Sequence, residues 1–224
     1  MTADAVTPVL TSWAERVADR SEAVQRSRTR QIEQAHAIVA AARRLIIERG
    51  DQFTTQELVK EAGVALQTFY RIFGGKDQLL LAVFEDLIAE SCADYEQAAE
   101  ALPDPIARLH FYVSVTVGGD AEESYGIGPR FVTAEHWRLH QLFPEEMTHA
   151  TQHFTDMVQR QLALAVEEGL ASSTDVPGDS WLITKLVMAT FHHYAYSEVP
   201  TDRTVIAEEL WSFCRRAIGG TESQ

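Results

Sequence analysis

The chain has 224 residues, of which 46% are hydrophobic and 23% are charged, a composition that suits a folded globular protein with one or two hydrophobic cores. It holds no run of 18 or more apolar residues, and its first ten residues lack the basic start and apolar core of a signal peptide, so we expect no membrane span and no export. The net charge is −14, but residues 1–80 carry 11 Lys and Arg against 10 Asp and Glu, which leaves 8 against 23 in residues 81–224. The acidic excess therefore lies outside the first third of the chain.

Residues 1–29 form a predicted N-terminal extension ahead of the first strongly periodic segment. We expect a mobile terminus before about Thr11. A helix over residues 10–28 would carry a thin apolar stripe and dispersed arginines. The stripe consists of Trp13, Val17 and Val24, and the arginines are Arg16, Arg20, Arg26 and Arg28, which together with Arg30 give the extension a basic end.

Residues 30–76 form the predicted first domain, which opens with a helix over residues 31–50. Its apolar residues recur at three- and four-residue steps, as one buried face of a helix requires, and Gly50 ends it. This face consists of Ile32, Ala35, Val39, Ala42, Leu45 and Ile46.

A capping box opens the next stretch, TTQELVKEAGVALQTFYRIFGGK, which covers residues 54–76. The Thr54 hydroxyl can accept a hydrogen bond from the N–H of Glu57, and the Glu57 carboxylate can accept one from the N–H of Thr54. The helix that starts there is predicted to end near Ala62, because Gly63 adopts a left-handed conformation at little cost.

A second short helix follows this glycine turn and ends before Gly74 and Gly75. Helix, glycine turn and helix are typical of a helix-turn-helix, although the same layout also occurs in helical proteins that never bind DNA. The predicted core face of the second helix holds Val64, Phe69 and Phe73, and the opposite face holds Gln67, Thr68, Tyr70 and Arg71.

Residues 77–224 form the predicted second domain, in which Pro and Gly separate helices and no segment alternates like a strand. The predicted fold class is therefore all-α, with a three-helix helix-turn-helix head followed by a larger helical body. A connector helix over residues 76–101 joins the two. Further helices are predicted over residues 106–117, 130–142, 145–168, 180–197 and 202–218, with Asp179 or Ser180 as the cap of the fourth.

The segments AARRLIIERG, TTQELVKEAGV and TFYRIFGGKDQLLLAV, in this order, resemble the N-terminal domain of the tetracycline-repressor (TetR) family of transcription regulators. The resemblance covers residues 31–87 and implies a homodimer that binds double-stranded DNA. Ala65 stands where a serine often caps the recognition helix, Phe69 replaces a leucine, and Ile72 replaces a histidine. The link from Gly50 to Thr54 is one residue shorter than usual.

The resemblance also places the DNA contacts. Gln67 and Thr68, with Gln56 and Thr55, would face base edges, since Gln can pair with adenine and Thr can contact the thymine methyl group. Independently of the resemblance, the basic end of the extension would act as an arm or an extra helix on the DNA backbone or minor groove. Phosphate contacts fall on Thr54, Tyr70 and Lys76, with Arg71 in either role, and the whole predicted set is Thr54, Thr55, Gln56, Ala65, Leu66, Gln67, Thr68, Tyr70, Arg71 and Lys76.

The helices near residues 145–168 and 180–197 are predicted to form the homodimer contact. The second is apolar around most of its circumference and has one charged residue, Lys185, between Trp181 and Tyr196. Such a helix needs two apolar neighbours, namely its own body and a partner chain across a two-fold axis. The alternative is complete burial inside one monomer.

Aromatic residues are dense between the connector and the 145–168 helix, which predicts a mostly apolar pocket for a small hydrophobic or aromatic effector. The alternative for many of them is an ordinary core position. The predicted ligand-binding residues are Tyr95, Phe111, Tyr112, Val115, Phe131, Trp137, His140 and Phe143, with Tyr125 among them in the sequence.

Other chemistry has weaker support in the sequence. His136 and His140 are four residues apart, as are His149 and His153, but no cysteine joins them and no HExxH pattern is present, so we expect no metal and no other cofactor. Without a GxSxG or a phosphate-binding glycine loop, we do not expect an enzyme. The two cysteines, Cys92 and Cys214, lie far apart, which favours buried thiols in a reducing cytoplasm over a disulfide.

The predicted function is a repressor that a small effector releases from a palindromic operator. The connector is the only long element that joins head and body in sequence, so a ligand that favours one tilt of it would change the spacing of the two heads. In a corepressed regulator, the ligand would act through the same helix but would strengthen DNA binding instead of weakening it. An architectural DNA-binding protein without an effector would have a solid body instead of an apolar cavity.

Overall fold

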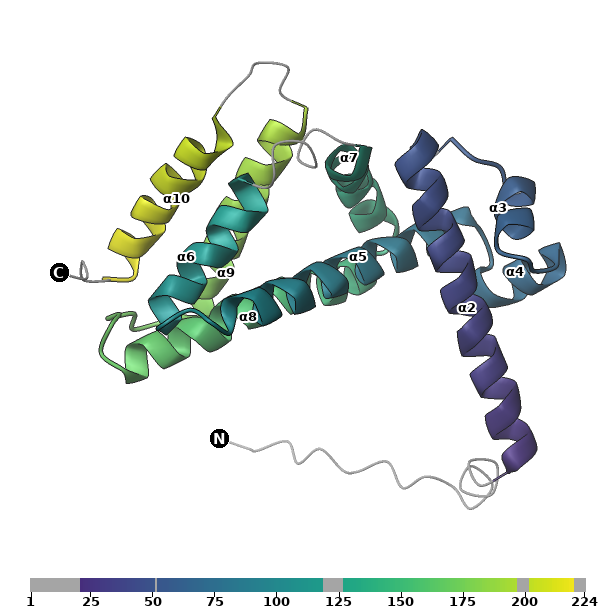
Figure 1. Cartoon of the computed structure of the whole chain (residues 1–224), viewed down its shortest axis with the longest axis horizontal. Coiled ribbons are helices and arrows are strands. Elements are labelled where there is room, and N and C mark those ends of the chain that lie inside the picture. Colours follow the sequence, from purple (N-terminus) through teal and green to yellow (C-terminus); the bar gives the residue numbers. More distant parts are fainter. Residues whose placement is uncertain (1–20, 51, 119–126, 197–201, 220–224) are drawn as a thin grey trace, which may run out of the picture.

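The structure is a computed structural model that describes residues 21–50, 52–118, 127–196 and 202–219 (Figure 1). All regular secondary structure in these ranges is α-helical, so the predicted all-α class is confirmed. The helices are α2 (Glu22–Arg49), α3 (Thr55–Glu61), α4 (Leu66–Phe73), α5 (Lys76–Ala99), α6 (Pro105–Gly118), α7 (Ile127–Leu142), α8 (Pro144–Glu167), α9 (Val176–Ala195) and α10 (Arg203–Ala217).

The head is built by α2, α3 and α4 around a shared hydrophobic centre. Phe69 of α4 and Ile38 of α2 are fully buried, and Leu58 of α3 is 1% exposed. Burying one such side chain contributes about 1.5–3 kcal/mol. These three residues therefore provide much of the packing energy that stabilises α3 and α4, which are too short to be stable alone.

The hydrophobic core of the head continues into the body. The cluster that holds Phe69 also holds Phe84 of α5, Leu139 of α7 and Met147 of α8. The helix α7 packs against α2 as well as against α5 and α9 (Figure 1), and Arg138 of α7 donates a hydrogen bond to Asp77 at the start of α5, at 2.7 Å. The division at residue 76 remains a prediction, but α5 is not the only body element in contact with the head.

A second hydrophobic cluster fills the rest of the body. It joins α6, α8, α9 and α10, with Cys92 and Ala99 of α5 at its edge. The helices α5 and α8 lie side by side along much of their length (Figure 1). An ion pair between Arg160 of α8 and Glu96 of α5 lies on the outside of this contact. The connector is therefore held by the body over most of its length.

The first helix is longer than predicted. It begins at Glu22 instead of residue 31, so Arg26, Arg28 and Arg30 lie on a helix continuous with the head, which agrees with the alternative of an extra helical segment. Their contact with DNA stays a prediction. The N-terminal turns of α2 project beyond α3 and α4 (Figure 1), which leaves Ile32 49% exposed instead of buried. The extension before residue 21, with Trp13, Val17, Arg16 and Arg20, lies outside the described residues.

Two body helices also begin earlier than predicted. In α9 the cap is Asp175, whose carboxylate accepts a hydrogen bond from the N–H of Gly178 at 3.1 Å, and not Asp179 or Ser180. Pro177 fits the first turn because a proline lacks only an N–H that would have no helical partner there. The helix α7 begins at Ile127 instead of residue 130, so its first turn includes Gly128 and Pro129.

Cys92 and Cys214 are both free and buried, as predicted. Burial raises the pKa of each thiol to about 11, which keeps them protonated and poorly reactive at neutral pH. Within the described part of the chain, no helix is long and apolar enough to span a bilayer.

Candidate nucleic-acid interface and effector site

The helix-turn-helix has the predicted cap at the start of α3 and the predicted glycine turn between α3 and α4. The Thr54 hydroxyl accepts from the Glu57 N–H at 3.2 Å, and the Glu57 carboxylate accepts from the Thr54 N–H at 2.8 Å, so the capping box is complete. Gly63 has a φ of +67°, in the region where glycine is favoured. Ala65 is the N-cap of α4 and supplies no side-chain hydrogen bond, so α4 lacks the cap that α3 has.

The helix α4 presents a polar face to solvent. While Phe69 faces the core, Gln67, Tyr70 and Arg71 are exposed at i, i+3 and i+4, so they share one side of the helix. Leu66 is also exposed and Thr68 is half-buried beside them. An amide and a guanidinium on one exposed helix face are the groups that read adenine and guanine edges in a major groove.

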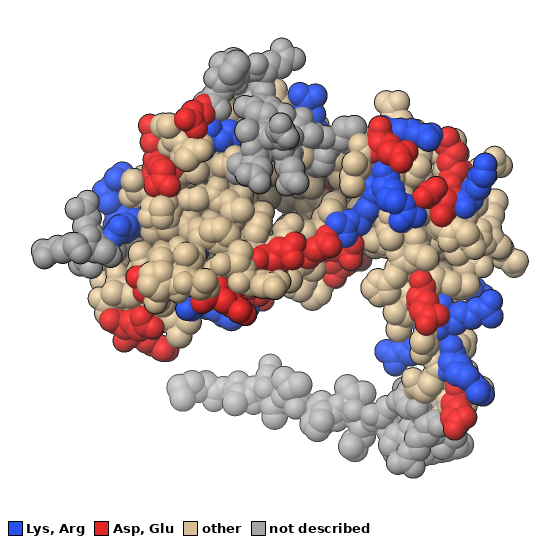
Figure 2. Space-filling view, in the orientation of Figure 1, with Lys and Arg blue, Asp and Glu red and all other residues tan. Residues whose placement is uncertain are grey.

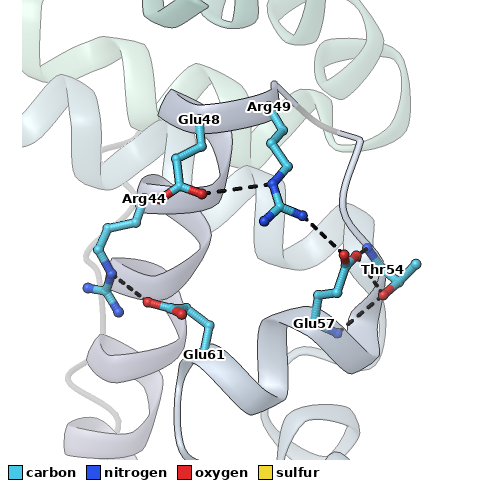
Figure 3. A network of polar contacts seen from close by, with 6 residues as sticks. All are labelled: Arg44, Glu48, Arg49, Thr54, Glu57 and Glu61. Carbon is cyan, nitrogen blue, oxygen red and sulfur yellow. Dashed lines mark hydrogen bonds and ion pairs between the residues drawn. The ribbon is translucent and has the colours of Figure 1, made fainter.

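Two ion pairs join α2 to α3, and a third lies within α2 (Figure 3). Arg44 lies 2.9 Å from Glu61, and Arg49 lies 3.1 Å from Glu57 and 3.8 Å from Glu48. These groups are about half exposed, so each pair contributes only about 0–1 kcal/mol. The hydrogen bonds from Thr54, followed by the weaker influence of Arg49, hold the pKa of the Glu57 carboxyl below its usual value.

Three predicted DNA contacts already have partners within the head. Thr54 Oγ1 donates to Glu57 at 2.8 Å, and Arg71 donates to Gln34 of α2 at 3.4 Å. Lys76 Nζ donates to the Phe53 carbonyl at 3.3 Å and lies 4.5 Å from the centre of the Phe53 ring. A phosphate would have to share or replace these bonds, so these side chains also position the ends of the head helices.

The charged side chains are unevenly distributed. Figure 2 shows Lys and Arg gathered on the projecting end of α2 and Asp and Glu along α5. Arg26, Arg28 and Arg30 are exposed on α2. The bond between Arg71 and Gln34 joins the exposed face of α4 to the same helix. A cationic flank of this kind attracts phosphate, while the acidic body repels it.

The structure does not bring the eight predicted ligand-binding residues together. Trp137 is 64% exposed, and His140 is also exposed. Phe131 and Phe143 belong to the cluster shared with the head. Tyr95, Phe111 and Tyr112 belong to the cluster of the body, and Val115 of α6 is half-buried. Tyr125 lies outside the described residues.

A pair of histidines that the sequence did not single out meets inside the body. The rings of His136 on α7 and His192 on α9 have centroids 4.8 Å apart, and Phe84 of α5 lies 5.9 Å from His136. His192 Nδ1 is 2.9 Å from the Thr133 hydroxyl. Within the described residues, the buried nitrogens His136 Nδ1 and His192 Nε2 have no hydrogen-bond partner.

Both histidines are neutral at pH 7. Burial, followed by the nearby His192, His140 and Lys185, lowers the pKa of His136 to about 4, and burial lowers the pKa of His192. Leaving a buried polar atom unpaired costs about 1–3 kcal/mol, which a bound hydroxyl or carbonyl would recover. No spacing in the sequence identifies this pair, because it arises only where α7 crosses α9.

Two surface depressions lie elsewhere on the body. One is lined by α10 and the other by α9 and α10, around His193 and Leu210, and neither includes any of the eight predicted residues. Both are open to solvent, so they are not the enclosed apolar cavity that would distinguish a ligand-responsive body from a solid one.

One face of α9 has no partner in the described chain. Ile183 and Val187 are buried against the body, whereas Trp181 and Leu182 are 52% and 53% exposed and Leu186 is 36% exposed. The alternative of complete burial of α9 inside one monomer is therefore wrong. Exposed apolar side chains that cluster in this way are typical of a surface that another protein covers.

The sequence of the head matches the family described as "Bacterial regulatory proteins, tetR family", over residues 38–83. A similar curated protein is the HTH-type transcriptional regulator EthR of Mycolicibacterium smegmatis, with 34% identity over 71 residues. That match covers 31% of this chain, and the chain spans about a third (33%) of the length of EthR.

Solved structures share the fold of nearly the whole chain. RolR in complex with resorcinol has a TM-score of 0.61 at 19% identity and covers 86% of this chain and 91% of its own. Thermus thermophilus FadR in complex with lauroyl-CoA has a TM-score of 0.64 at 18% identity and covers 84% of this chain and 97% of its own. At these identities the likeness concerns the fold alone. The head therefore matches the model of the tetR family of bacterial regulatory proteins over residues 38–83, and the chain shares the overall fold of RolR and FadR.

Proposed function

We propose that this protein is a transcriptional regulator that binds a palindromic DNA site as a homodimer and is released from it by a small hydrophobic or aromatic effector. The observation that carries this proposal is the exposed face of α4, with Gln67, Tyr70 and Arg71, on a head that matches the tetR family. In a helix-turn-helix, this is the helix that enters the major groove.

The contacts sort into two kinds. Gln67 and Thr68 of α4, with Thr55 and Gln56 at the start of α3, read base edges. Thr54, Tyr70 and Lys76 position the head on phosphates, and Arg71 serves either role. The exposed arginines of α2 extend the phosphate contacts beyond the motif, and they do so from a helix that is continuous with the head.

The dimer would form through α8 and α9, with the exposed Leu182 and Leu186 at its centre. Leu186→Glu places a charge in this seam and should yield monomers in sedimentation velocity. The matched control is Ile47→Glu, which puts the same charge on a residue of α2 that is 67% exposed and outside the seam. An unchanged dimer in Leu186→Glu would move the interface to another surface.

The effector would bind beside His136 and His192, where its polar group could pair with the two buried nitrogens and its apolar part could contact Phe84. The helix α7 carries His136 and packs on α2, and α5 carries Phe84 and continues into the head. An effector that prefers one arrangement of these two helices must change the head spacing, and DNA must weaken effector binding by the same factor.

The test begins with selection of duplexes from a random pool by the purified full chain. An inverted repeat with half-sites about 34–36 Å apart is the expected product. The selected duplex is then titrated with and without resorcinol and lauroyl-CoA, which are bound in RolR and FadR, as first probes of the body. A probe that binds the body and weakens DNA binding supports release, and a probe that strengthens it reverses the sign.

A further inference from the structure

We propose that Glu85, His149 and His153 form a binding site for a divalent transition-metal ion, with Zn²⁺ as the best-suited ion, and that this ion joins α5 to α8. The sequence contains the two histidines four residues apart but gives no third ligand for them. The fold supplies it, because α5 lies along α8 and brings the carboxylate of Glu85 to the histidine pair.

The geometry of the three side chains suits one ion. One ligand atom from each of the three residues can be chosen so that all lie within 4.8 Å of one another, and His149 Nε2 is 3.9 Å from Glu85 Oε1. The two imidazole rings have centroids 5.7 Å apart. In a tetrahedral zinc site with bonds of about 2.0–2.1 Å, ligand atoms are about 3.3 Å apart. Since His149 and His153 are exposed, side-chain rotations can close the remaining distance without moving a helix.

The donor set also matches the chemistry of the metal. Two imidazoles and one carboxylate, with a water in the fourth position, are a familiar set of ligands for Zn²⁺, and imidazole also suits Co²⁺, Ni²⁺ and Cu²⁺. The alternative use of these groups is a solvent-exposed ion pair between Glu85 and a protonated His149, which would contribute little. Metal binding and this ion pair exclude each other, because a ligating histidine has no proton on the metal-bound nitrogen.

The other histidine pair on the chain is less suitable. His136 and His140 stack with ring centroids 6.4 Å apart, but His136 is packed against Phe84 and His192. Within the described residues, the only group of three potential ligands at this spacing is the one between α5 and α8.

The position of the site between the two cores would allow a bound ion to restrain the connector helix. Glu85 stands in the first half of α5, between the core shared with the head and the core of the body, so an ion there would restrain α5 against α8. Any effect on DNA binding through the head spacing would rest on the proposed function. Metal binding itself does not, and it is measured without DNA.

The experiment titrates ZnCl₂ into the full chain, without a polyhistidine tag, by isothermal calorimetry and follows Co²⁺ binding by its visible absorption. We expect one site per chain and tetrahedral Co²⁺ bands. His149→Gln, His153→Gln and Glu85→Gln should each weaken binding at least about tenfold, since even outer-shell changes cost about 10–100-fold in metal affinity. Zn²⁺ should also raise the Tm of the wild type but not of these variants, because an ion that binds only the folded state stabilises it by mass action.

Two further variants show whether the assignment is right. His36→Gln removes an exposed histidine of α2 and should leave the affinity unchanged. His140→Gln removes a member of the other pair. Equal Zn²⁺ affinity in the wild type and His149→Gln would overturn the proposal, as would loss of binding in His140→Gln alone or no binding by the wild type. Circular dichroism confirms folding, and the variant positions are exposed or half-buried, so large folding defects are not expected.

Discussion

The candidate DNA-binding face of the head lies on a single short helix, whereas the histidine pair of the body joins two helices that are distant in sequence. In α4, burial of Phe69 fixes the rotation of the helix and thereby exposes Gln67, Tyr70 and Arg71. In the body, the position of His136 relative to His192 depends on how α7 packs between α2, α5 and α9. A change in the head should therefore act on one interface, while a change near α7 should reach both domains.

The largest effect on stability should come from truncating one buried leucine in each of the two hydrophobic cores. Leu139 of α7 lies in the core shared with the head, and Leu162 of α8 lies in the body core, both fully buried. Leu139→Ala and Leu162→Ala should each lower the free energy of unfolding by about 2–5 kcal/mol in urea titrations.

The two variants should differ in where the loosening occurs. Leu139→Ala should reduce hydrogen-exchange protection of the amides in α2, whereas Leu162→Ala should leave α2 protected in sub-global exchange. Equal loss of α2 protection in both variants would show that head and body unfold as one unit and would remove the distinction between the two cores.

The next effect concerns pH. The pKa of His136 is about 4 in the folded chain and near 6.5 when unfolded, so the unfolded chain binds more protons between these values. Stability is therefore complete above about pH 6.5 and falls as the pH drops toward 4, by up to about 3 kcal/mol. The lowered pKa of His192 acts in the same direction.

His136→Gln should reduce this pH dependence, and urea midpoints at about pH 5 and about pH 7.5 measure it. His36→Gln, which removes an exposed histidine, serves as the control and should keep the dependence of the wild type. If His136→Gln and the wild type lose the same stability on acidification, the buried pair is not its source.

The contrast between the two regions also explains how much the sequence could predict. Thr54, Gly63 and the spacing of Phe69 act over a few residues, so the elements of the helix-turn-helix were predicted close to their observed ends. Asp175 was missed as the cap of α9 because Pro177 and Gly178, which follow it closely, also fitted a turn. Tyr95 and Phe131 were grouped because aromatic residues are dense between residues 95 and 143, but the two lie on different helices and belong to different cores. The meeting of His136 with His192 is set by helix packing, which periodicity does not encode.

A smaller effect is expected at the DNA-binding face itself. Gln67→Ala should cost about 1–3 kcal/mol on the selected duplex and relax the preference at one base pair, while Lys76→Ala should weaken all duplexes alike and flatten the salt dependence. Fluorescence anisotropy with singly substituted duplexes measures both. Gln97→Ala, on an exposed position of α5, should change neither. An equal loss on every duplex for Gln67→Ala would remove its role in base recognition.

The smallest effects concern the two caps of the head. Thr54→Ala breaks the capping box of α3 and should lower the free energy of unfolding by about 0.5–2 kcal/mol. Ala65→Ser supplies the hydroxyl that α4 lacks and should raise stability by up to about 1 kcal/mol. Urea midpoints compare them, and a loss of stability in Ala65→Ser would mean that the start of α4 cannot place a serine side chain over its first turn.

The central claim is that the head recognises a DNA sequence, and the most direct test is the affinity of the wild-type chain for the selected inverted repeat against a scrambled duplex of the same composition. Both titrations must use the same salt concentration, because phosphate contacts make affinity salt-dependent. We expect binding to the inverted repeat to be at least about 10³-fold tighter than to the scrambled duplex. Equal affinity for the two duplexes would contradict it.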